Sequence, residues 1–149
     1  MKKILAYFML ITFVSVGCGE KKSALVIYKT NDGAINGYDP VSYHNEKPVK
    51  GIEDYSHEWQ DATWYFASEE NLALFKTDPE RYAPQFGGYC AYGMAEGHKA
   101  STQPDAWTIV DGKLYLNYNK EVLSTWRENR DEFIKQAEGN WPSVSDDPF

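Results

Sequence analysis

The residues with the most distinctive chemistry lie in and around the stretch FGGYCAYGM, residues 86–94. Cys90 offers a thiolate, Met94 a thioether four residues later, and His98 an imidazole soon after. Soft sulfur ligands with imidazole suit copper, and thiolate with imidazole also suits zinc. If this stretch forms a helical turn, Cys90 and Met94 share one face. The sequence therefore predicts a candidate copper or zinc site with Cys90 and the upstream His57 as its first ligands, and with His98 and Met94 as candidates to complete the set.

Two other roles for Cys90 stay open. Cysteine and methionine are often buried, where they pack as soft hydrophobes. A nucleophilic cysteine would need a neighbouring base such as His57 and a group that orients it. The sequence contains no phosphate-binding loop, dinucleotide fingerprint or zinc-protease helix. An enzyme is therefore the less favoured interpretation, and no catalytic residue is predicted.

Two β-hairpins are predicted around these residues. Residues 55–66 form two β-prone runs separated by Gln60 and Asp61, with tryptophans as packing residues. Residues 106–118 form two further β-rich runs joined by Asp-Gly, a strong short-range signal for a hairpin turn.

Two helices complete the predicted domain. Ser68 can cap a short central helix over residues 69–77, where two acidic residues in the first turn suit the helix dipole. A longer C-terminal helix is predicted from Asn119 as N-cap, and Gly139 can end it. The fold class is thus α+β, a small single domain. The side chains expected in its core are Phe66, Phe75, Tyr82, Trp107, Leu114 and Trp126.

The start of the chain resembles a bacterial lipoprotein signal. Lys2 and Lys3 precede a short apolar run that ends in SVGC, which predicts cleavage before Cys18 and lipid on that cysteine. We expect a signal peptide over residues 1–17 and a lipidated tether over 18–33. The alternative is an ordinary secretory signal with a chance cysteine. The predicted location is the cell envelope, lipid-anchored at the outer membrane and facing the periplasm, with the membrane as a partner through Cys18.

Charge and cysteine content narrow the function further. The chain has 149 residues and a net charge of −7, which argues against nucleic-acid binding because that binding depends on cationic contacts to phosphate. With Cys18 lipidated, Cys90 is the only other cysteine in the sequence, so no intramolecular disulfide can form. An unpaired cysteine in an exported protein must be buried, metal-bound or exposed to oxidation.

Four segments together resemble the long form of the YHS-domain family: NGYDPVSYH, HEWQDATWYFASEENLALFKTDPERYAPQFGGYCAYG, DAWTIVDGKLYLNYNKEV and NWP. They occur in the order and at the spacing of the family. The resemblance implies a YHS-like domain over residues 34–142, followed by a flexible tail over 143–149.

Short members of this family resemble metal-binding modules with two cysteines after a Tyr-Tyr-Phe core. In this sequence those two positions are Ala67 and Asn71, so the thiolate pair is missing. The upstream histidine of the family is matched by His57. The resemblance implies a binding module for copper, zinc or a small ligand, and the lipoprotein-like signal predicts that it is exported and membrane-tethered. The alternatives are a redox protein or enzyme that uses Cys90, and a domain that binds an unidentified protein partner without chemistry of its own.

Overall fold

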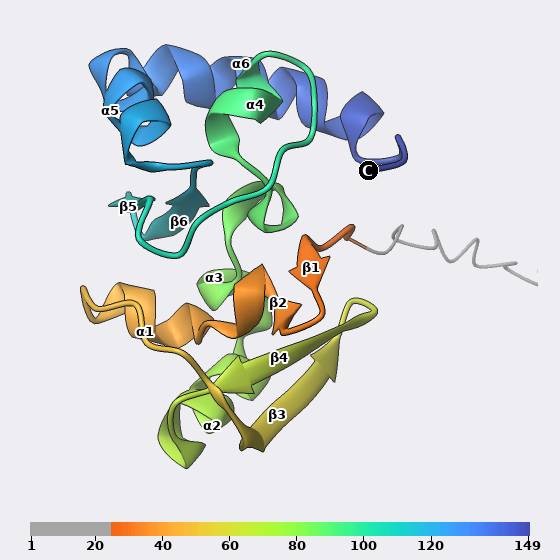
Figure 1. Cartoon of the computed structure of the whole chain (residues 1–149), viewed down its shortest axis with the longest axis vertical. Helices are drawn as coiled ribbons and strands as arrows, with labels where there is room; N and C mark the ends of the chain where they lie inside the picture. The colour runs from red at the N-terminus through yellow and green to blue at the C-terminus, as the bar shows by residue number, and fades with distance from the viewer. Residues whose placement is uncertain (1–24) are drawn as a thin grey trace, which may run out of the picture.

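The computed structural model describes residues 25–149, which form an α+β domain as predicted (Figure 1). Its strands pair in three antiparallel hairpins, β1–β2, β3–β4 and β5–β6. In chain order the elements are β1 (Lys29–Thr30), β2 (Gly33–Ala34), the 3-10 helix η1 (Ile35–Gly37), α1 (Pro40–His44), β3 (Ile52–Trp59), β4 (Ala62–Phe66), α2 (Glu69–Thr77), α3 (Pro79–Tyr82), η2 (Gln85–Gly88), α4 (Ala91–Ala95), β5 (Trp107–Val110), β6 (Lys113–Leu116), α5 (Lys120–Glu128) and α6 (Arg130–Val144).

Both predicted hairpins are confirmed, and each turns where the sequence indicates. Gln60 and Asp61 have φ angles of 53° and 56°, and Asp111 and Gly112 have φ angles of 50° and 75°. Two consecutive residues with positive φ form the two-residue turn whose twist matches that of paired strands. The β1–β2 hairpin was not predicted, because its two-residue strands are too short to show alternation.

The central helix is also confirmed, over the predicted residues. The Ser68 hydroxyl accepts a hydrogen bond from the Asn71 amide at 3.1 Å, so it caps α2 as expected. Asp78 then ends α2 and caps α3, and Pro79 stands at the first position of α3.

The C-terminal helix differs from the prediction of a single long element. Asn119 caps α5 as predicted, but the chain leaves helical geometry at Asn129 (φ −140°) and starts α6 there. Gly139 does not end α6, which continues to Val144. A glycine inside a helix costs only about 1 kcal/mol, and burial of Ala137 and Val144 on either side of it favours continuation of the helix.

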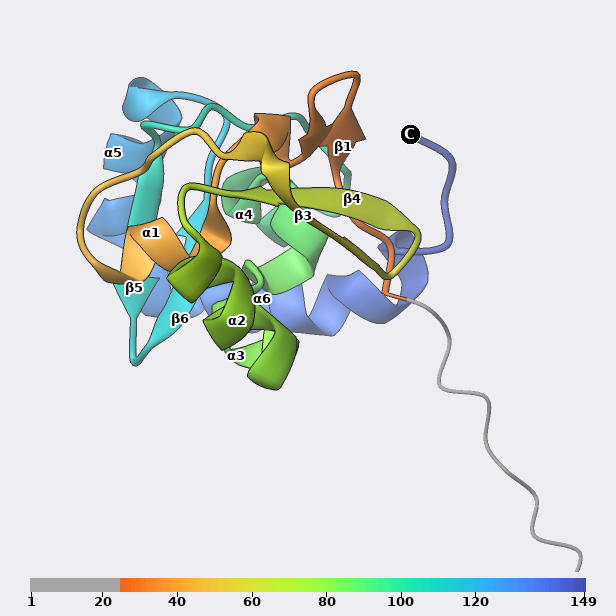
Figure 2. The same ribbon diagram turned by 90° about the horizontal axis from the view of Figure 1, so that it is seen from below.

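The core consists of two clusters of buried side chains, shared by the β5–β6 hairpin. Leu114 and Leu116 of β6 belong to a first cluster with β4, α1 and α2, whereas Tyr115 belongs to a second with α4, α5 and α6. This follows from the alternation of side chains along a strand. Figure 1 shows the β3–β4 hairpin and α2 at one end of the molecule and α4–α6 at the other, and Figure 2 views it from the first end.

The predicted core residues divide into two groups. Phe66, Phe75, Leu114 and Trp126 are completely buried, whereas Tyr82 and Trp107 are only partly buried at the edge of the first cluster.

The folded contacts extend beyond both ends of the predicted domain. Ile27 and Tyr28 are buried ahead of residue 34. In the predicted tail Val144 is buried, and the Phe149 ring lies 5.2 Å from that of Tyr89. The predicted signal peptide and Cys18 lie outside the described residues. Within residues 25–149 we find no helix of the length and apolar character needed to cross a bilayer.

Candidate functional site

Ala67 and Asn71, which stand where short YHS domains have their two cysteines, lie around the buried carboxylate of Asp39. Its side chain is fully buried and receives four hydrogen bonds. Oδ1 accepts hydrogen bonds from the amides of Val41 at 2.8 Å and Ser42 at 3.3 Å, so Asp39 caps α1. Oδ2 accepts from the Ala67 amide at 2.9 Å and from Asn71 Nδ2 at 2.6 Å. One carboxylate thus ties together the start of α1, the end of β4 and the first turn of α2.

This arrangement gives the two substituted positions a structural role. Ala67 has no side-chain ligand atom, and the Asn71 amide group is engaged by Asp39. A metal site at these positions would need soft or imidazole donors that neither residue has.

Cys90 occupies the N-cap of α4 and is 1% exposed. Its sulfur accepts a hydrogen bond from the Gly93 amide at 3.4 Å, and the thiol can donate to Asn117 Oδ1 at 3.6 Å. Burial raises the pKa of the Cys90 thiol, and nearby backbone amides oppose this only in part. The sulfur is therefore predominantly a neutral thiol at pH 7, which makes it a weak nucleophile.

The predicted ligands come together only in part. Met94 lies one turn after Cys90 and is fully buried in the second core cluster. His98 is exposed, but its ring lies over Gly93, because a Cβ built there would be 3.3 Å from His98 Nε2. Cys90 and His98 therefore lie beside α4, and Met94 is part of it.

His57 does not join them. It stands on β3 with its ring 6.4 Å from that of Phe75, at the end of the molecule opposite α4 (Figure 1). Over residues 25–149 we find no cluster of three or more histidine, cysteine, aspartate or glutamate side chains that could hold a metal ion.

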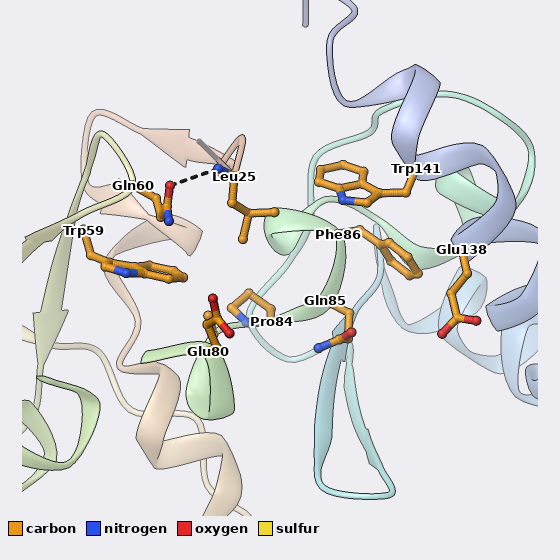
Figure 3. Close-up of a pocket in the computed structure, with 10 residues that line it drawn as sticks. Leu25, Trp59, Gln60, Glu80, Pro84, Gln85, Phe86, Glu138 and Trp141 are labelled. Atoms are coloured by element: carbon orange, nitrogen blue, oxygen red, sulfur yellow. Dashed lines mark hydrogen bonds between the residues drawn. The ribbon is translucent and has the colours of Figure 1, made fainter. Parts of the chain in front are cut away.

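A cleft of about 430 Å³ lies at the seam between the two ends of the molecule. Figure 3 shows Trp59 and Gln60, from the β3–β4 turn, on one side, and Phe86 and Trp141 on the other. Leu25 also lines the cleft, and its backbone amide donates to Gln60 Oε1 at 2.9 Å.

The aromatic side chains of the cleft are held by packing behind them. The Trp59 ring lies 5.6 Å from that of Phe75 and 5.8 Å from that of Trp64, both completely buried. On the other side the rings of Phe86 and Trp141 are 6.0 Å apart. Both walls are therefore anchored to a core cluster, which favours a preformed pocket.

The backbone next to the cleft residue Phe86 depends on Gly87. Its φ is 62°, and a Cβ at this position would lie 1.8 Å from the Val26 carbonyl oxygen. The Tyr28 amide donates to the Gly87 carbonyl at 2.9 Å. Glycine thus allows the segment that begins at Leu25 to lie directly against η2.

Sequence reasoning missed both Asp39 and the cleft. For Asp39 a signal was present, since Asp followed directly by Pro is typical of an N-cap and the first position of a helix. The cleft has no such signal, because its lining comes from four separate segments, near residues 25, 59, 80–86 and 138–141.

Comparison with known proteins identifies a family for part of the chain. Residues 40–86 match the family model of the YHS domain, a span from α1 to η2 that includes His57, Ala67 and Asn71. The match is narrower than the predicted resemblance and does not include Cys90, Met94 or His98. Neither a curated protein nor a solved structure matches the chain. By this match, residues 40–86 of the chain form a YHS domain.

Proposed function

We propose that this protein is an exported, lipid-anchored binding module that holds a small organic ligand in the cleft between its two core clusters. The cleft carries the proposal. Its volume of about 430 Å³ lies within the range of small-molecule sites. It combines apolar aromatic walls with a few polar groups such as Gln60 and Gln85, a composition typical of such sites.

The proposed anchor would keep the cleft close to a membrane. Cleavage before Cys18 would leave seven residue steps to Leu25, which span at most about 25 Å. Because Leu25 lines the cleft, its ligand would be bound near the lipid surface of the outer membrane. Mass spectrometry of native protein should show a mature chain that starts at Cys18 and carries acyl mass. An intact N-terminus, or native protein free of lipid, would contradict the anchor.

Ligand binding can be tested without knowledge of the natural ligand. We would titrate a fragment library into the domain of residues 25–149 and follow the indole N–H signals of Trp59 and Trp141 by NMR. We expect a subset of fragments to shift both signals, and Trp141→Leu to weaken those fragments. Buried Trp126 provides the internal control, because its indole lies away from the cleft. The proposal fails if no fragment shifts the cleft signals, or if Trp141→Leu binds every fragment equally well.

A soft-metal site at α4 is the second candidate. The observation that favours it is that His98 Nε2 and the Cys90 sulfur both lie beside Gly93, with Met94 next along α4. Copper(I) and zinc titrations of wild type, Cys90→Ser and His98→Ala would test it. His57→Ala serves as a matched control, because His57 lies at the far end of the molecule. Loss of metal binding in Cys90→Ser and His98→Ala, but not in His57→Ala, would support this site. Metal binding by Cys90→Ser as tight as that of wild type would exclude it.

A further inference from the structure

We propose that the ligand of the cleft is a planar aromatic compound with a carbonyl group, its ring against Trp59 and its oxygen bound by the side-chain amide of Gln60. This inference rests on the proposed function of the cleft and names the class of its ligand. Trp59 ends β3 and Gln60 opens the β3–β4 turn, and both line the cleft (Figure 3). Two consecutive residues therefore supply an aromatic ring and a hydrogen-bonding group to the same space.

The Gln60 amide group is oriented to act as a donor toward a ligand. The Leu25 backbone amide can only donate, so the Gln60 atom that it meets at 2.9 Å is the oxygen, Oε1. The nitrogen, Nε2, then lies on the side of the group away from Leu25 (Figure 3). Within residues 25–149 the bond to Leu25 is the only one that this amide group makes. A ligand that covers Nε2 therefore needs an acceptor such as a carbonyl oxygen, because a buried donor without a partner weakens binding.

The aromatic rings of the cleft favour a flat ligand. Trp59 meets Phe75 at an interplanar angle of 89° and Trp64 at 58°, so neither neighbour is stacked parallel on it. On the opposite side Phe86 and Trp141 meet at 62°. An added planar ring can therefore take the offset-stacked position on Trp59, an arrangement that aromatic pairs prefer.

An aliphatic ligand of the same volume is the alternative. It would also bury apolar surface against Leu25, Pro84 and Phe86. It would gain nothing from ring stacking, however, and would cover Gln60 Nε2 without accepting a hydrogen bond. Because the hydrophobic effect follows the apolar area removed from water, the experiment must separate ring planarity and the carbonyl group from apolar area.

Benzamide and cyclohexanecarboxamide test the ring. They carry the same amide group on rings of similar size, one planar and one puckered. We would measure both by NMR titration of the Trp59 and Trp141 indole signals. We expect benzamide to bind about threefold to tenfold more tightly, the size of one aromatic pair. The saturated ring buries no less apolar surface, so the hydrophobic effect alone predicts equal or tighter binding of cyclohexanecarboxamide.

Acetophenone and α-methylstyrene test the carbonyl group, because a CH₂ group replaces the oxygen in the second compound. Gln60→Glu is the matched variant, since a carboxylate still accepts from the Leu25 amide but has no N–H to donate. It should weaken acetophenone about threefold to tenfold, the size of one net hydrogen bond, and leave α-methylstyrene unchanged. Gln103→Glu adds the same charge at an exposed position that does not line the cleft, and it should change neither affinity.

Trp59→Leu assigns the stacking to a named ring. This variant keeps an apolar side chain and removes the aromatic face, so benzamide affinity should fall to that of cyclohexanecarboxamide, read from the Trp141 indole signal. Trp107→Leu is the matched control, because Trp107 is also partly buried against the first core cluster but does not line the cleft. Thermal unfolding of each variant shows whether a lost signal reflects lost folding.

The outcomes distinguish this inference from the function beneath it. Equal affinity for benzamide and cyclohexanecarboxamide, or an equal response of acetophenone and α-methylstyrene to Gln60→Glu, overturns the aromatic carbonyl class while the cleft remains a binding site. Fragment hits confined to aliphatic molecules have the same meaning. If none of the four probes and no fragment shifts the cleft signals, both proposals fail.

Discussion

Removal of the buried Asp39 carboxylate should destabilise the domain more than any surface substitution. The change is Asp39→Ala, which deletes an acceptor of four hydrogen bonds at 2.6–3.3 Å in a completely buried position. Each buried donor left without a partner costs about 1–3 kcal/mol. The Ser42 amide keeps a second acceptor, the Asp39 backbone carbonyl at 3.2 Å, so three donors lose their partner. Even at the low end of that range they sum to about 3 kcal/mol, a large part of the roughly 5–15 kcal/mol that stabilises a typical domain.

The assay is urea unfolding at pH 7, followed by tryptophan fluorescence and circular dichroism. Asn71→Ala removes one of the four donors and should cost about 1 kcal/mol. The double variant Asp39→Ala with Asn71→Ala should lose less than the sum of the two, by about 1 kcal/mol, because the Asn71 donor is no longer left unpaired. Asp32→Ala is the matched control. Its exposed pair with Lys50, at 3.0 Å, should contribute less than about 1 kcal/mol.

A small effect would refute this reasoning. If Asp39→Ala lost less than about 1 kcal/mol with an unchanged denaturant slope, the four hydrogen bonds would not be stabilising the fold. An additive double-mutant cycle would likewise show that Asp39 and Asn71 are not coupled.

Three further experiments test other parts of the structure. Burial lowers the pKa of His44 below its ordinary value of 6.5, so the folded state binds the proton more weakly than the unfolded state. Stability present above pH 6.5 should therefore be lost as pH falls through the lowered pKa. His44→Phe should show a flatter dependence of unfolding free energy on pH in urea unfolding, and parallel curves for the two proteins would contradict this. The buried Cys90 thiol should react with a disulfide reagent at least about 100-fold more slowly in the native state than in urea, because reaction requires local opening; comparable rates would instead support a reactive thiol. Asn119→Ala should cost about 1 kcal/mol in unfolding free energy, because it removes the hydrogen bond from the Val122 amide to Asn119 Oδ1, at 2.8 Å. Asn119→Ser should retain most of the wild-type stability. Equal stability of Asn119→Ala and wild type would show that the cap does not stabilise α5.

The elements that were predicted correctly depend on chemistry within a few residues. Asp111-Gly112 sets one hairpin turn by backbone conformation, and Ser68 sets the start of α2 with one hydrogen bond. The strands beside the first turn alternate in burial over residues 55–59 and 62–66, so the hydrophobic pattern and the turn agree there, whereas β6 is buried continuously from Leu114 to Leu116. Local signals of this kind do not require knowledge of the rest of the fold.

The elements that were missed depend on contacts between distant segments. The C-terminal helix splits at Asn129, and α5 and α6 bury Trp126 and Ala137 in the same cluster. Helical spacing alone cannot distinguish a continuous helix from two helices that pack on one core. The cleft depends even more on tertiary structure, since Leu25 and Trp141 line the same cleft although they stand near opposite ends of the described chain.

The metal prediction shows the same division between local and distant contacts. Cys90, Met94 and His98 are close in sequence and remain close around α4, whereas His57 was added from upstream by family resemblance and lies elsewhere. The lipid on Cys18, the outer-membrane location and the bound metal all stay predictions.

Asp39 gives a physical reason why the YHS-matched residues can hold together without the thiolate pair. A metal bound at the positions of Ala67 and Asn71 would join the end of β4 to α2, and the Asp39 carboxylate already makes that connection through hydrogen bonds to both residues. It also caps α1, so three elements are joined without an ion. Because the carboxylate is fully buried and its acceptor sites are used, adding a metal there would require these bonds to break. The space for the ligand that we propose is elsewhere, in the aromatic cleft between the YHS-matched residues and α6.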